Sequence, residues 1–293
     1  MSKPIASRSA GVVLGILGML GFSGTLVTTR VAVADFTPLD ITCARIVMAG
    51  GLGAAYLFLT DQRAPPERRF LLPILVMGLG LAVGYPLFLA LALETVPAIH
   101  GAVVTGLAPA ATAIISVLRT GERPPLPFWI ACLIGFSAVL YFAFDAGGGH
   151  LSLADGWLLL GMLSLGIAYV EGGRVSRELG GSVTLSWAML FLTPFATLPL
   201  VNGLDAFDAA AVSAASWISL AYLGIISMFL ASVCWYRGLA LGGIARIGQI
   251  NLLLPLTALG WSALFLGEEI TATAIICAIV VLVAMIVCLK SKS

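Results

Sequence analysis

Charged residues are scarce in this chain: only 10% of its 293 residues are Asp, Glu, Lys or Arg, whereas 60% are hydrophobic. Soluble domains carry about a quarter charged residues, and a soluble protein of this length has too little interior to hide so many apolar side chains. The mean hydropathy is +1.08. This composition excludes an ordinary soluble protein and predicts a polytopic membrane protein.

Cysteine and histidine are also few. The five cysteines lie in apolar runs and show neither CxxC nor Cys/His spacing, so we expect no metal, no cofactor and no structural disulfide. The two histidines, His100 and His150, form no HExxH pattern, and the chain lacks phosphate-cradling and nucleophile-elbow patterns. We therefore expect that the protein is not an enzyme.

The apolar residues form helix-length runs rather than the alternating strands of a barrel. Because about 20 apolar residues cross the hydrocarbon of a bilayer, the pattern predicts an all-α protein with ten transmembrane helices and a retained first helix. Thr37 and Pro38 are typical of a helix start, and the prolines of GERPPLPF predict a break before the fifth span. The predicted spans lie near residues 10–29, 38–60, 70–92, 97–118, 126–144, 153–173, 183–202, 212–236, 243–266 and 271–289.

Lys and Arg are distributed unevenly between the two sides of these spans. Arg30 lies alone on one side, Arg45 lies within the second span, and the other thirteen flank the spans on the opposite side. Because cytoplasmic loops carry an excess of positive charge, this asymmetry predicts that both termini are cytoplasmic. We expect the inner (plasma) membrane as the location.

One pattern is written twice. PAATAIISVLRTGE (Pro109–Glu122) is echoed by PLTALGWSALFLGE (Pro255–Glu268) at an offset of 146, half the chain length. Five spans per half is an odd number, so the second copy enters the membrane upside down. The sequence therefore predicts two inverted five-helix repeats, residues 1–146 and 147–293, a layout typical of secondary transporters.

These features resemble the EamA family of the drug/metabolite transporter superfamily. The resemblance is carried by the Gly-Glu pairs that end the two echoed segments, Gly121-Glu122 and Gly267-Glu268, which we call the two Gly-Glu signatures. It is also carried by PLDITCARIVMAG (Pro38–Gly50), with its arginine. Within that family the chain is most similar to YddG-type exporters of aromatic amino acids and methyl viologen. The resemblance implies export of small molecules across a membrane.

Aromatic residues at membrane depth are the first candidates for a substrate cavity. Tyr85 lies in the third span, followed by Pro86 and Phe88, and Tyr169 lies in the inner part of the sixth span. Trp235 and Tyr236 end the eighth span beside Arg237. An aromatic belt at the interface is the competing interpretation, especially for these last two.

Polar candidates are fewer. His100, at the outer start of the fourth span, is interpreted either as a donor at a cavity mouth or as a residue that extends to the headgroups. Gln249 and Asn251 in the ninth span suit either substrate binding or contacts between helices, with Gln249 preferred. Arg45 is interpreted as structural or gating, with Asp40 or backbone carbonyls as its expected partners.

The expected mechanism is alternating access. Pro109 and Pro255 are expected near the middle of their helices, where a kink helps gating together with Pro86. No span carries Asp or Glu near its centre, which favours a facilitative carrier over a proton-driven antiporter. Glu94 and Glu171, near span ends, are weak candidates for ion coupling.

The predicted function is export of small amphipathic metabolites, above all aromatic and other neutral amino acids. The alternative is a multidrug or organic-cation exporter, with or without proton coupling. Expected partners are the small-molecule substrate and the lipid bilayer, with no nucleic acid and no obligate protein partner.

Overall fold

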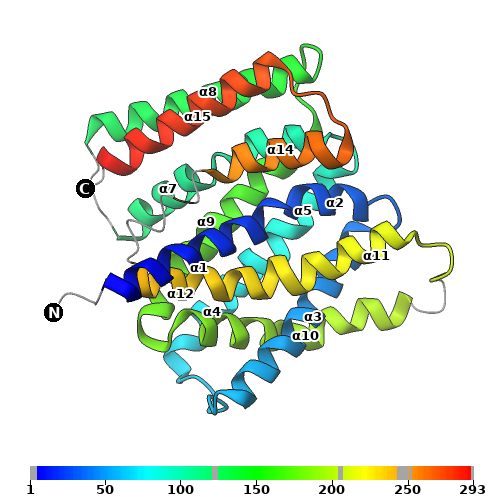
Figure 1. Ribbon diagram of the computed structural model, residues 1–293, viewed down its shortest axis with the longest axis vertical. Coiled ribbons are helices and arrows are strands. Elements are labelled where there is room, and N and C mark those ends of the chain that lie inside the picture. The colour runs from blue at the N-terminus through cyan, green and yellow to red at the C-terminus, as the bar shows by residue number, and fades with distance from the viewer. Residues whose placement is uncertain (1–4, 121–124, 204–206, 243–249, 251–252, 292–293) are drawn as a thin grey trace.

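The computed structural model describes residues 5–120, 125–203, 207–242, 250 and 253–291. Within these ranges every regular element is a helix, and Figure 1 gives their arrangement. The long helices are α1 (Ile5–Ser23), α2 (Thr25–Ala32), α3 (Pro38–Leu59), α4 (Arg68–Gly78), α5 (Tyr85–Leu93), α6 (Ala98–Thr105), α7 (Ala108–Thr120), α8 (Leu126–Ala146), α9 (Leu153–Leu179), α10 (Gly181–Gly203), α11 (Ala214–Ala221), α12 (Ala231–Gly242), α14 (Leu254–Leu266) and α15 (Ala272–Ser291). Two π-helical segments, η1 (Leu79–Gly84) and η3 (Tyr222–Leu230), interrupt this series.

Eight helical segments of the described chain are long and apolar enough to cross a membrane, and each corresponds to one of the first eight predicted spans. Two further apolar helices are shorter, Leu254–Leu266 and Ala272–Ala284. They fall in the predicted ninth and tenth spans. The beginning of the ninth span lies outside the described residues.

Local sequence signals placed two helix starts correctly. Thr37 caps α3, since its hydroxyl oxygen accepts a hydrogen bond from the backbone N–H of Asp40 at 3.2 Å, and Pro38 is the first helical residue. α8 begins at Leu126, directly after Pro125. Both starts use proline where a helix has no need of its N–H.

Pro109 lies near the middle of the span Ala98–Arg119, as predicted, and is the second residue of its second helical segment, α7. Pro255 is the second residue of α14, and most of the predicted ninth span before it lies outside the described residues. A turn at Gly106–Leu107 separates α6 from α7. Because proline removes one intrahelical hydrogen bond and clashes with the preceding turn, the span breaks and a new helix begins with proline in its first turn.

Pro86 does not break its span. It is the second residue of α5, and the preceding turn widens into η1, where the N–H of Tyr85 bonds to the carbonyl of Gly80. Such a five-residue step absorbs the interruption without ending the span, and π-turns occur frequently at functional sites. The break therefore places Tyr85 at the junction of two helical segments.

Element boundaries recur at the offset of 146. α4 and α11 begin at Arg68 and Ala214, and α8 and α15 begin at Leu126 and Ala272. The helices α7 (Ala108–Thr120) and α14 (Leu254–Leu266) have the same length and the same offset. The shifted counterpart of η1, residues 225–230, falls inside η3.

The helices pack in pairs. Figure 1 shows α8 beside α15 at one end of the bundle, α1 along α12, and α3 against α10. Two large apolar cores form between them. The first is built mainly from α5, α6, α7, α8, α14 and α15, and the second from α3, α4, α10 and η3. Because α9 contributes to both, with Leu158 to the first core and Val175 to the second, it crosses the seam between them.

Candidate functional site

Three tyrosines lie near the seam between the two cores. Tyr85 at the start of α5 packs against the first core, Tyr236 on α12 packs against the second, and Tyr169 lies on α9 between Leu158 and Val175. Tyr169 is within electrostatic range of both other tyrosines. All three side chains are only partly buried. We call Tyr85, Tyr169 and Tyr236 the tyrosine group.

The position of Tyr236 depends on a glycine. An added Cβ at Gly181, the first residue of α10, would lie 2.5 Å from Cγ of the Tyr236 ring. No side chain larger than hydrogen fits there without moving the ring. Tyr236 thus belongs to the interior of the bundle, whereas the sequence favoured an interfacial belt. The preceding residue, Trp235, packs edge-on against Phe22 of α1, with ring centroids 6.3 Å apart.

Arg45 lies beside the tyrosine group. Its side chain is buried, with 2% of the residue exposed, and its charge interacts with Tyr85. Its Nε and Nη1 atoms are buried and have no hydrogen-bond partner in the described part of the chain. The expected partner Asp40 is half-buried and accepts a hydrogen bond from the Thr37 hydroxyl at 2.6 Å. The partner assignment for Arg45 was therefore wrong, because a cap interaction holds the carboxylate at the helix start.

Phe88 lies one turn after Tyr85 and stacks on Trp157 of α9, with centroids 5.6 Å apart and planes inclined by 7°. Trp157 was missed by sequence reasoning. Trp157 lies in the first turns of the sixth span, and nothing in the neighbouring sequence indicated which side chain it would contact. This stack extends the aromatic surface from the tyrosine group along α5 and α9.

His100 is buried near the start of α6 and forms a close pair with Asp155. The distance from its Nε2 to Asp155 Oδ1 is 2.6 Å, and the Phe142 ring lies 5.2 Å from the imidazole. The other carboxylate oxygen of Asp155 accepts from the N–H and the hydroxyl of Ser152. His100 is 5% exposed, so it does not extend to the headgroups as one interpretation expected. Its carboxylate partner overcomes the preference for water.

Glu268 is the glutamate of the second Gly-Glu signature, and it caps α6 from the other half of the chain. Its two carboxylate oxygens accept from the backbone N–H groups of Ala98 at 2.8 Å and Ile99 at 2.7 Å. The preceding Gly267 ends α14 with a φ of 65°, a left-handed conformation that glycine adopts without strain. The carboxylate satisfies two N–H groups that have no partner within the helix.

A second charged cluster joins α7 to α9. Glu171 is buried and accepts from Arg119 Nε and Arg174 Nη1, both at 2.7 Å. Arg69 and Glu178 form a further, exposed ion pair at 3.1 Å. Arg119 and Arg69 precede position 146, whereas Glu171 and Glu178 follow it. Glu171 is therefore engaged by two cations and joins the two halves of the chain.

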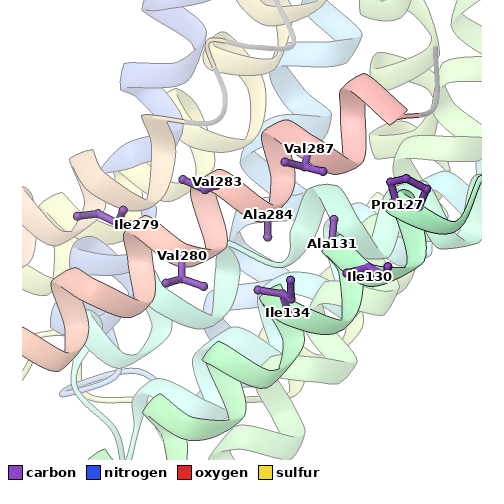
Figure 2. Close-up of a pocket in the computed structure, with 9 residues that line it drawn as sticks. All are labelled: Pro127, Ile130, Ala131, Ile134, Ile279, Val280, Val283, Ala284 and Val287. Atoms are coloured by element: carbon purple, nitrogen blue, oxygen red, sulfur yellow. The ribbon is translucent and has the colours of Figure 1, made fainter.

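A groove of about 380 Å³ lies between α8 and α15 (Figure 2). These two helices carry none of the three tyrosines. The lining of the groove is apolar: Pro127, Ile130, Ala131, Ile134, Ile279, Val280, Val283, Ala284 and Val287. Such a surface suits acyl chains rather than a polar substrate. The tyrosine group with Arg45 is accordingly the better candidate site.

Two candidates from the sequence, Gln249 and Asn251, fall outside the described ranges. Of the remaining cavity candidates, the structure brings Tyr85 and Tyr169 together. Phe88 lies next to them along α5. His100 instead pairs with Asp155, and Trp235 packs against Phe22.

Known proteins similar to this chain are transporters. A transporter of Bacillus subtilis (strain 168), "Uncharacterized transporter YdeK", is 41% identical over 260 residues, covering 89% of this chain and 90% of that protein. "Uncharacterized inner membrane transporter YedA" of Escherichia coli (strain K12) is 29% identical over 163 residues, 54% of this chain and 52% of that protein.

A solved crystal structure has the same fold, with a TM-score of 0.62 and 18% identity over 96% of each chain. The model of the EamA-like transporter family matches twice, at residues 9–144 and 152–290. These matches cover nearly the whole chain and agree with its helical, multi-pass architecture. The chain belongs to the EamA-like transporter family.

Proposed function

We propose that this protein exports small amphipathic metabolites, foremost aromatic and other neutral amino acids, across the inner membrane. The observation that carries the proposal is the tyrosine group. Three half-buried aromatic rings from α5, α9 and α12 lie near the seam between two apolar cores, within electrostatic range of one another through Tyr169. Aromatic faces with hydroxyl groups suit a substrate that has an apolar body and a polar end.

The proposed architecture is ten spans in two inverted repeats, residues 1–146 and 147–293, with both termini cytoplasmic. The recurrence of helix starts at an offset of 146 and the two matches to one family model support it. The uneven distribution of Lys and Arg supports the orientation. In this layout the tyrosine group draws on both repeats, as expected of a substrate site.

Alternating access would then break the contacts that join the halves at one end of the bundle at a time. At the proposed outer end these are the His100–Asp155 pair and the Glu268 cap on α6. At the proposed cytoplasmic end they are Arg119–Glu171 and Arg69–Glu178. Each set consists of a few polar contacts. A modest difference in free energy therefore suffices to form one set while the other is broken.

We propose facilitative transport. The buried carboxylates of the described residues, Asp155 and Glu171, are both paired and lie near span ends. Arg45 beside the tyrosine group would repel an organic dication, which favours amino acids over methyl viologen-like cations.

Reconstitution in liposomes tests this function. Labelled phenylalanine should enter saturably without a pH gradient, and Tyr85→Ala should reduce that flux at least tenfold. Tyr141→Ala is the matched control, because Tyr141 is 61% exposed on the outside of α8. Accumulation against the phenylalanine gradient, driven by a pH difference alone, would contradict facilitative transport.

A further inference from the structure

Arg45 is unusual among the described charged residues, because it is buried without a partner. It lies seven residues after the start of α3, about 10 Å along the helix. A charged group at this depth is normally paired with another charge or with backbone carbonyls. The two guanidinium nitrogens Nε and Nη1 have neither in the described chain.

In the described part of the chain no anion is paired with Arg45. Asp40, the acidic residue nearest to it along α3, is half-buried and its carboxylate accepts from the Thr37 hydroxyl. The neighbouring titratable group is the phenol of Tyr85, which is neutral near pH 7. An arginine left in this state is strongly disfavoured unless an anion from elsewhere satisfies it.

We infer that Arg45 binds the carboxylate of the transported molecule, with the body of that molecule against the tyrosine group. This inference rests on the proposed function and narrows its substrate class to monocarboxylates. The planar guanidinium presents paired N–H donors that match the two oxygens of a carboxylate. A single arginine balances one negative charge, whereas a phosphate ester would call for further cations.

This contact predicts selectivity for substrates that carry a carboxylate. A monocarboxylate neutralises the arginine as it enters, while a substrate without a carboxylate leaves two buried donors unsatisfied. A site built around a polar partner rejects analogues that lack it much more strongly than an apolar pocket rejects a change of size. The amino group of an amino acid is not required by this contact.

The test compares two small ligands that share a phenyl ring. Purified protein is titrated with 3-phenylpropionate, which has only the carboxylate, and with phenethylamine, which has only the amine. Binding is measured by equilibrium dialysis in detergent. Sodium chloride keeps the ionic strength equal in all samples, so that chloride is present as the control anion. We expect 3-phenylpropionate to bind the wild type and phenethylamine to bind at least about thirtyfold more weakly.

Arg45→Gln should abolish this preference by weakening 3-phenylpropionate binding at least about thirtyfold. It should leave the thermal stability of the ligand-free protein unchanged or higher, because it removes an unpaired buried charge. Arg45→Lys keeps the charge without the paired donors and should retain an intermediate preference. Arg30→Gln is the control, since Arg30 already donates to the carbonyl of Leu93 at 2.8 Å.

Three results would overturn the inference: no 3-phenylpropionate binding by the wild type, equal 3-phenylpropionate binding by Arg45→Gln, or equal binding of 3-phenylpropionate and phenethylamine by the wild type. The ligand comparison on the wild type decides the matter even if the variants fail to fold. Carboxylate binding that depends on Arg45, without any phenylalanine flux in liposomes, would support the inference and refute the proposed export of amino acids.

Discussion

The cap on α6 allows a prediction from two hydrogen bonds. Replacing Glu268 by alanine removes both carboxylate acceptors and leaves the N–H groups of Ala98 and Ile99 unsatisfied. Each hydrogen bond to a charged group contributes about 1.5–3 kcal/mol, and partial exposure of Glu268 reduces this. We therefore expect the opening free energy of the first turn of α6 to fall by about 2–4 kcal/mol.

Amide hydrogen exchange measures this directly. Exchange through local opening accelerates tenfold for each 1.4 kcal/mol, so the amides of Ala98 and Ile99 should exchange roughly thirty- to several-hundredfold faster in Glu268→Ala. Glu268→Gln keeps one acceptor oxygen and should show a smaller effect. The flank of the helix that holds His100 should loosen with it, because His100 follows Ile99 directly.

Glu269→Ala is the matched control, because Glu269 is the exposed neighbour of Glu268. It should leave α6 exchange unchanged. Unaltered protection of Ala98 and Ile99 in Glu268→Ala would refute the reasoning, since the cap would then contribute nothing to the start of α6.

Two further predictions concern single side chains. Gly181→Ala should displace the Tyr236 ring and reduce phenylalanine flux severalfold, because its methyl group would overlap the ring; Gly173→Ala, with open space around its added Cβ, should leave flux unchanged. Asp35, in the loop before α3, accepts from the hydroxyl and N–H of Ser213, and these bonds lower the pKa of its carboxyl. Its contribution to stability is therefore present above the ordinary aspartate pKa of about 3.9 and is lost as pH falls through the lower folded-state pKa. Thermal melts between pH 2 and 6 should show a smaller acid-induced loss in Asp35→Asn than in the wild type, and identical curves would contradict this.

Local signals in the sequence were sufficient for the class of protein and the approximate limits of the first eight spans, but not for the breaks inside them. Hydropathy depends on runs of neighbouring residues, and the start of α3 depends on Thr37 and Pro38, which lie side by side. The Gly-Glu signature marked Glu268 as notable and indicated the family. It gave no role for the carboxylate, because the amides that it caps are 169 and 170 residues away.

The candidate site depended on packing between helices. Tyr169 and Tyr236 lie on different spans, and their approach requires the close contact of Gly181 with the ring of Tyr236, which no local pattern encodes. The sequence by itself determined that Arg45 lies inside a span. Only the tertiary structure decided that it is left without a partner, because the positions of every other helix determine which groups reach a buried guanidinium.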